Sequence, residues 1–224
     1  MKYILENDKL QVVVNSFAAE LQGIRSKATG LEYMWQPGAE IWNNRSILLF
    51  PNPGRIAHDR IIVGGKVYPA TMHGFAKDME FTVEELSDER IVLELAASDD
   101  TRFYFPYEFL FRVTFELKGD VLEQRFDVVN KDNKDMYFCL GAHPGFYCPI
   151  ELGESGDDYV LRFDPPQQML RTETEAGTRL LTGKTKPVAL ENGTDMFVGE
   201  KFFNDDPKLF SNVKADTITL LSKK

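Results

Sequence analysis

The sequence has 224 residues, and 35 acidic against 26 basic side chains give it a formal net charge of −9 at pH 7. This charge argues against nucleic acid and acidic membranes as partners, because both are polyanions. Hydrophobic residues make up 43% of the chain, which is enough for a substantial core and excludes wholesale disorder. No run of about 18 apolar residues predicts a membrane-spanning helix.

The N-terminal segment turns polar after Tyr3, Ile4 and Leu5, so it lacks the apolar core of a signal peptide. We therefore expect a cytoplasmic protein. In that compartment the two cysteines, Cys139 and Cys148, are expected to be reduced and packed, because thiols there are kept out of disulfides.

Alternation of apolar and polar residues predicts β-strands along most of the chain. In chain order they cover 10–14, 18–26, 81–86, 91–95, 109–117, 121–130, 136–140, 159–163, 180–181, 195–197 and 217–221. Polar turns at 87–90, 118–120 and 131–134 separate strands about ten residues apart, a spacing typical of a β-sandwich or β-barrel.

Helical signals are scarce. A short helical turn is predicted over 204–210, where Pro207 suits the first helical position. The chain has no GxGxxG sequence and no P-loop, which argues against a nucleotide-binding α/β fold. The acidic pairs at 99–100, 157–158 and 205–206 are interpreted as solvated turns rather than catalytic pairs.

Three segments have the composition of a functional site. In the first, Leu48 to Ile56 (LLFPNPGRI), two prolines and a glycine precede Arg55. Prolines stiffen a loop and glycine permits close approach of the backbone, so Arg55 is either held in a fixed place or solvated at an ordinary turn.

The second segment, Met72 to Asp78 (MHGFAKD), places His73 beside Gly74 and Phe75. An imidazole can hydrogen-bond sugar hydroxyls, and an aromatic ring can stack on the apolar face of a pyranose. The alternative is a half-buried histidine that ends a loop.

The third segment, Cys139 to Pro149 (CLGAHPGFYCP), is the most unusual. A predicted strand ends in Gly141, and His143 follows before a proline that favours an extended backbone. The expected result is a rigidly held imidazole at a strand end, next to Phe146, able to act as a general acid. His58, His73 and His143 lack metal-ligand spacing, so we expect no metal.

Together these segments resemble the aldose 1-epimerase family, also called galactose mutarotases, and most closely its LacX-like branch. The matching pieces occur in the same order: LLFPNPGRI at 48–56, HGFAKDMEF at 73–81, FPYEFLFRVTFEL at 105–117 and LGAHPGFYCPI at 140–150. The resemblance implies an all-β supersandwich of large antiparallel sheets, forming one domain over residues 1–224.

The resemblance also implies an activity. The family opens the hemiacetal ring of a free aldose such as glucose or galactose by acid–base chemistry and closes it on the other face, without a cofactor. Carried over to this sequence, His143 is the general acid, His73 hydrogen-bonds the sugar and Arg55 holds its hydroxyls. Phe75 and Phe146 are proposed as stacking neighbours on chemical grounds alone.

Two family positions fall in the C-terminal region. A sugar-binding aspartate matches Asp216 best, with Asp195 as its rival. The family's general base is a glutamate near the C-terminus, and no acidic residue follows Asp216 in this sequence. We therefore expect the chain to lack the base and the last strands of the domain.

Two alternatives to an active epimerase follow. One is a carbohydrate-binding protein without catalysis. The other is a hexose-phosphate epimerase-like protein, which would gather basic side chains near the cleft, with these candidates: Arg45, Arg55, Arg60 and Lys77. Exposed sheet edges in a shortened domain also favour a homo-oligomer.

Overall fold

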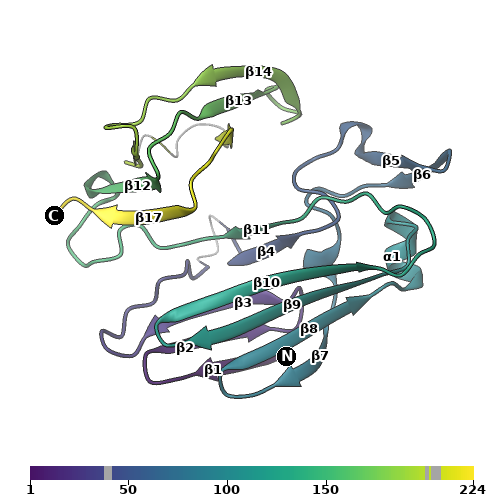
Figure 1. Ribbon diagram of the computed structural model, residues 1–224, viewed down its shortest axis with the longest axis horizontal. Helices are drawn as coiled ribbons and strands as arrows, with labels where there is room; N and C mark the ends of the chain where they lie inside the picture. Colours follow the sequence, from purple (N-terminus) through teal and green to yellow (C-terminus); the bar gives the residue numbers. More distant parts are fainter. Residues whose placement is uncertain (38–41, 200–201, 203–207) are drawn as a thin grey trace. The chain divides into compact units, whose positions relative to one another are not determined.

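The structure is a computed structural model that describes residues 1–37, 42–199, 202 and 208–224 (Figure 1). The chain divides into two compact units, residues 1–147 and 148–224, and each is described by itself. That residues 1–224 form one domain stays a prediction.

The first unit consists of antiparallel strands in four sheets, with strand orders β1-β2-β3, β10-β9-β8-β7, β11-β4 and β5-β6. Their bounds are β1 (Lys2–Glu6), β2 (Leu10–Asn15), β3 (Glu20–Ser26), β4 (Ser46–Leu49), β5 (Arg60–Val63), β6 (Lys66–Pro69), β7 (Thr82–Leu86), β8 (Arg90–Ala96), β9 (Phe109–Lys118), β10 (Val121–Asn130) and β11 (Gly141–Pro144).

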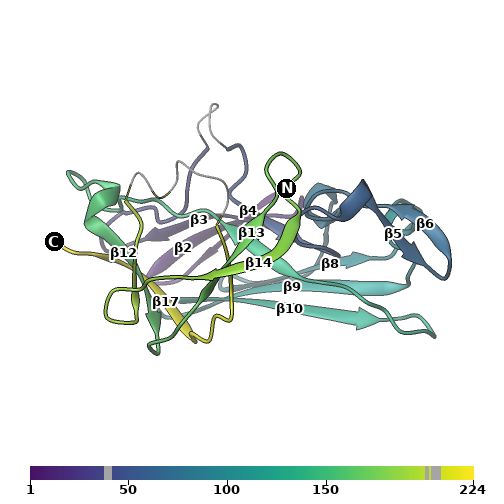
Figure 2. The same ribbon diagram turned by 90° about the horizontal axis from the view of Figure 1, so that it is seen from above.

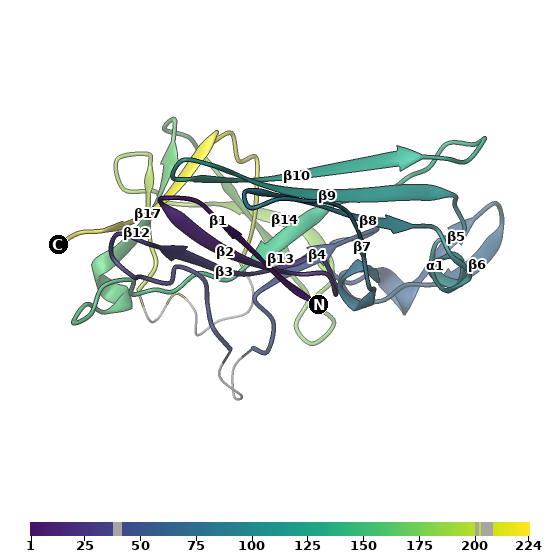
Figure 3. The same cartoon turned by 90° about the horizontal axis from the view of Figure 1, so that it is seen from below.

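Two of these sheets, β1-β2-β3 and β10-β9-β8-β7, enclose one hydrophobic core (Figure 3). Alternate residues of each strand face it, because successive side chains of a strand point to opposite sides. Val12 and Val14 of β2 and Phe111, Val113 and Phe115 of β9 are fully buried. The predicted all-β class is confirmed, and so are the predicted connections at 87–90, between β7 and β8, and at 118–120, between β9 and β10.

The second unit contains two antiparallel sheets with strand orders β15-β12-β17 and β14-β13-β16 (Figure 2). Their bounds are β12 (Tyr159–Asp164), β13 (Leu170–Thr174), β14 (Leu181–Pro187), β15 (Asp195–Phe197), β16 (Leu209–Ser211) and β17 (Thr217–Ser222). Phe163, Met169 and Met196 form its buried cluster.

Three local predictions differ from the structure. Residues 136–140 form no strand, and Tyr137 there is 78% exposed. The acidic pair at 99–100 opens helix α1 (Asp99–Tyr104), where Ser98 and Thr101 form a capping box that satisfies free N–H groups of the first turn. Most of the helical turn predicted over 204–210 lies outside the described residues, and Leu209 begins β16.

Both cysteines are free thiols, as predicted, but Cys139 is exposed rather than packed and only Cys148 is half-buried. Burial and the nearby Glu154 carboxylate raise the pKa of the Cys148 thiol. In the part of the chain that the structure describes, no helix is long and apolar enough to cross a bilayer.

Candidate functional site

A cavity of about 370 Å³ in the first unit brings two of the predicted site residues together. Among the described residues its lining consists of Trp42, Asn44, Ile47, Met72, His73, Lys77, Asp78 and His143. The ring centroids of His73 and His143 lie 6.0 Å apart, although the two residues are 70 positions apart in the chain.

Strand pairing holds His143 in place. It belongs to β11, whose residues pair with β4, and it lies opposite Ile47. The residue is the third of four in this short strand, so it lies near a strand end as predicted, but the strand is β11 and not the one predicted over 136–140. Its imidazole is exposed, and the indole of Trp42 meets it edge-on with 5.1 Å between ring centroids.

Packing against Gly145 and Trp35 holds Trp42 in place. A Cβ added to Gly145 would lie 2.9 Å from Trp42 Cζ3 and 3.1 Å from Trp35 Cβ, so only glycine leaves room for both indoles. Trp35 Nε1–H also donates a hydrogen bond of 3.1 Å to the Trp42 carbonyl oxygen. Trp42 was not predicted as a site residue, although its position as an aromatic residue just before the apolar run at 46–50 was the available signal.

The loop of the first motif, residues 48–56, holds His73 through hydrogen bonds. Its backbone N–H donates to the Gly54 carbonyl oxygen at 2.9 Å, and the Gly54 N–H donates to His73 Nδ1 at 3.0 Å. His73 has φ of 69°, which is uncommon for a residue other than glycine. Because Nδ1 accepts a hydrogen bond, the ring proton of the neutral imidazole lies on Nε2.

Electrostatics favour the neutral form of His73. Partial burial lowers its pKa, and the nearby His143 and Lys77 lower it further. A positive charge on this half-buried ring would lose hydration and face two other potential cations. The imidazole is therefore neutral at pH 7 and offers Nε2–H as a donor.

A close backbone contact joins the two loops that carry these residues. Phe50 forms a parallel bridge with Gly74, and a Cβ on Gly74 would lie 2.0 Å from the Phe50 carbonyl oxygen. Gly74 has φ of +73°, in the left-handed region that glycine adopts without strain. The glycine after His73 is thus required by both space and conformation.

The structure does not bring Arg55 into the cavity lining. Its guanidinium makes two hydrogen bonds to Asp59, Nε to Oδ1 at 2.9 Å and Nη2 to Oδ2 at 2.8 Å. These bonds raise the pKa of Arg55 and lower that of Asp59, and both side chains are about half exposed.

Neither proposed stacking residue lines the cavity. Phe75 is 2% exposed and packs with Phe50 and Phe105 in the core, so its ring has no free face for a sugar. This corrects the expectation for Phe75, whose apolar ring fills the core between sheets. Phe146 is 52% exposed and bridges to Met34.

The basic residues considered for a phosphate group are not gathered. Of the four, only Lys77 lines the cavity, and it forms an ion pair with Asp78. Arg45 Nε donates to Gln36 Oε1 at 3.1 Å, and Arg60 is exposed on β5. The arrangement gives no concentrated positive charge at the cavity.

Asp195 and Asp216 both belong to the second unit. Asp195 is 9% exposed and receives two hydrogen bonds from Arg162, at 2.8 and 2.7 Å. These bonds lower the pKa of Asp195 to about 2. Asp216 is exposed just before β17, and its N–H donates to the Asp164 carbonyl oxygen at 3.0 Å. Asp195 is already paired, whereas the Asp216 carboxylate is exposed.

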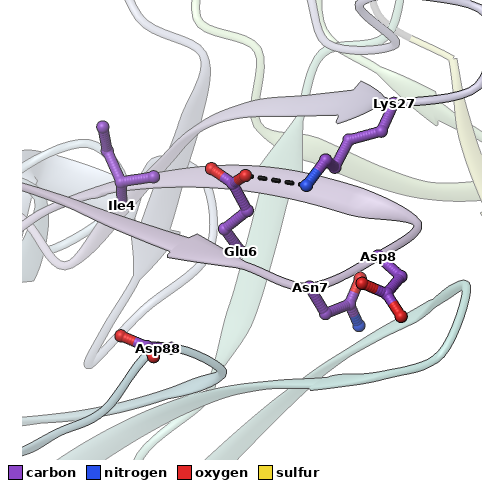
Figure 4. A pocket seen from close by; sticks show the side chains of 6 residues that line it. All are labelled: Ile4, Glu6, Asn7, Asp8, Lys27 and Asp88. Carbon is purple, nitrogen blue, oxygen red and sulfur yellow. Dashed lines mark hydrogen bonds and ion pairs between the residues drawn. The ribbon is translucent and has the colours of Figure 1, made fainter.

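A larger hollow of about 480 Å³ lies beside the β1–β2 turn and does not have the chemistry of an acid–base site (Figure 4). Its lining residues are Ile4, Glu6, Asn7, Asp8, Lys27 and Asp88. Lys27 and Glu6 form an ion pair of 2.8 Å, and the lining contains no histidine. Among the described residues, no cluster of three or more His, Cys, Asp or Glu side chains forms a metal site.

Comparison with known proteins shows one consistent relationship. The family model for aldose 1-epimerase matches residues 1–215. The plasmid-encoded protein LacX of Lactococcus lactis subsp. lactis is 30% identical over 226 residues, which cover 98% of this chain and 75% of LacX.

Two solved structures share the fold. A galactose mutarotase related enzyme from Lactobacillus acidophilus has 33% identity and a TM-score of 0.87, covering 94% of this chain and 69% of its own. A galactose mutarotase-like protein from Lactobacillus casei has 28% identity and a TM-score of 0.90, covering 99% and 76%. The expected galactose mutarotase-like fold is confirmed.

Proposed function

The chain belongs to the aldose 1-epimerase family, and we propose that it interconverts the α and β anomers of a free aldose such as glucose or galactose. The observation that carries this proposal is the pair of imidazoles, His73 and His143, 6.0 Å apart in one cavity beside Trp42. No other described cavity contains a histidine together with an aromatic wall.

The reaction needs a proton at the ring oxygen and a base at the anomeric hydroxyl. In our proposal His143 donates the proton to the ring oxygen as the C1–O bond breaks, and the base removes the hydroxyl proton to give the open-chain aldehyde. Rotation about C1–C2 and reversal of the proton transfers close the ring on the other face.

The other residues bind the sugar. His73 donates Nε2–H to a sugar oxygen, and Trp42 provides an apolar ring face, the part first assigned to Phe75. In this proposal Arg55, which follows Gly54 in the chain, exchanges its bonds to Asp59 for bonds to sugar hydroxyls. Phe146 completes the proposed binding residues of the first unit, and the assignment of Asp216, which belongs to the second unit, stays a prediction.

One observation favours binding of an aldose without conversion. Asp78 is the single carboxylate among the described lining residues, and it is already ion-paired with Lys77. A base other than Asp78 is therefore needed for full acid–base catalysis.

Polarimetry of freshly dissolved α-D-galactose and α-D-glucose separates the two functions. An epimerase accelerates the decay of optical rotation in proportion to protein concentration. Binding without acceleration, measured by calorimetry on the same sample, supports the carbohydrate-binding alternative, and absence of both contradicts a sugar site.

A further inference from the structure

Asn52 lies in the loop between Pro51 and Pro53, and it is 9% exposed. Its Nδ2 donates hydrogen bonds of 3.1 Å to the carbonyl oxygens of Gly54 and Thr71. Two carbonyl oxygens can be satisfied only by a donor with two hydrogens, so the amide orientation of Asn52 follows from its surroundings.

Gly54 is the residue that contacts the imidazole. It has φ of +78°, and a Cβ placed on it would meet no atom within 4 Å. Its carbonyl oxygen accepts from two donors, the Asn52 carboxamide at 3.1 Å and the His73 backbone N–H at 2.9 Å. Asn52 is the side chain of this pair, and by holding the Gly54 carbonyl it helps to orient the N–H of the same residue.

The same carboxamide also bonds to the loop that carries His73. Thr71, which accepts from Asn52, uses its own hydroxyl to donate to the Gly74 carbonyl oxygen at 2.8 Å. In the chain, His73 lies between Thr71 and Gly74. The Asn52 side chain therefore bonds both to the loop that carries His73 and to Gly54, which contacts its imidazole.

We propose that Asn52 is a positioning residue, which fixes His73 as the Nε2–H tautomer by holding the Gly54 N–H against Nδ1. This inference rests on the proposed function and adds to it the residue that maintains the His73 tautomer. With Nδ1 accepting from Gly54 and Nε2 protonated, His73 has no free lone pair. It donates a hydrogen bond to the sugar, and His143 alone of the pair transfers a proton.

Long-range ¹H–¹⁵N correlation NMR of the imidazoles tests the proposal, with signals assigned from His→Gln variants. In the unmodified protein at neutral pH, His73 shows protonated Nε2 and unprotonated Nδ1. An Nδ1–H tautomer in this spectrum overturns the proposal without any substitution.

In Asn52→Ala we expect the His73 signals to change to a mixture of both tautomers, while the His143 signals keep their positions. Asn130→Ala is the matched control, because Asn130 Nδ2 also braces a turn through a carbonyl oxygen, that of Lys134 at 2.8 Å, outside the cavity. An unchanged His73 tautomer in folded Asn52→Ala overturns the proposal.

Activity provides the second readout. Misplacement of a binding group lowers kcat by roughly tenfold to a hundredfold, and we expect this loss in Asn52→Ala but not in Asn130→Ala. If the unmodified protein has the predicted tautomer but no anomer exchange, the proposed function fails while the positioning role stands. If it has exchange but the other tautomer, the positioning role fails alone.

Discussion

His73 and His143 lie in the same cavity in different environments, and this difference separates their proposed roles. His73 is half-buried and its Nδ1 accepts from Gly54, whereas His143 is exposed on β11. One ring is thereby kept neutral as a donor, and the other is free to exchange protons with a ligand.

The lowered pKa of His73 predicts a pH dependence of stability. The unfolded chain binds a proton at the ordinary pKa near 6.5, and the folded protein resists that proton, so the free energy of unfolding decreases as pH falls below about 6.5. Urea unfolding at about pH 7.5 and about pH 5.5 measures this loss, which should be smaller in His73→Gln.

The matched control for this experiment is His58→Gln, because His58 is exposed and lies outside the cavity lining. It should keep the pH dependence of the unmodified protein. Equal pH dependence in His73→Gln and the unmodified protein would show that His73 does not resist protonation.

Trp42 should contribute to sugar binding through its apolar ring face. We expect Trp42→Ala to weaken binding of galactose by about tenfold, or ~1.4 kcal/mol, and Trp42→Phe to retain part of the affinity. Calorimetric titration measures both. Phe146→Ala tests a second exposed aromatic side chain. A larger loss of affinity in Phe146→Ala than in Trp42→Ala would favour Phe146, the residue proposed from sequence, as the main stacking residue.

At this scale the sequence predicted the two cavity histidines better than it predicted the surroundings of Phe75 and Arg55. Both cavity histidines were predicted, because residues such as Gly141 and Pro144 mark unusual local backbone. Phe75 was misassigned because its burial depends on Phe50 and Phe105, which are distant in the chain. The pairing of Arg55 with Asp59 likewise depends on a loop geometry that composition does not specify.

At the scale of elements, the contact between the Phe50 and Gly74 backbones connects the two motif loops. Gly74→Ala should cost roughly 3–5 kcal/mol, because a Cβ would collide with a carbonyl oxygen at a positive φ. Chemical denaturation monitored by near-ultraviolet circular dichroism measures the loss.

Gly119→Ala separates conformational strain from collision. Gly119 has φ of +63°, but a Cβ there would meet no atom within 4 Å, so we expect a cost of only about 1–2 kcal/mol. Equal costs for the two variants would mean that the Phe50 contact does not constrain the loop.

Strands with clear alternation, such as those from β8 to β10, were predictable because one face is buried and the other is not. β4 was missed because all four of its residues are buried, so it shows no alternation. Residues 136–140 show the reverse error, since this apolar run forms no strand, although Met136 and Leu140 pack against the core.

At the scale of the whole molecule, strand spacing predicted the all-β class, and the order of four motifs predicted the family. Neither strand spacing nor motif order predicted the division into residues 1–147 and 148–224. That division depends on contacts between residues that are distant in the chain. A homo-oligomer stays a prediction, for which size-exclusion chromatography with light scattering gives the mass directly.

Saturation transfer between the anomeric protons of galactose at equilibrium tests the central claim, that the cavity carrying His143 exchanges anomers. The unmodified protein and His58→Gln should transfer saturation at equal rates, and His143→Gln should be slower by about 10²–10⁴-fold. Equal transfer in His143→Gln and the unmodified protein, or no transfer above the rate in buffer for any of the three, would contradict the account.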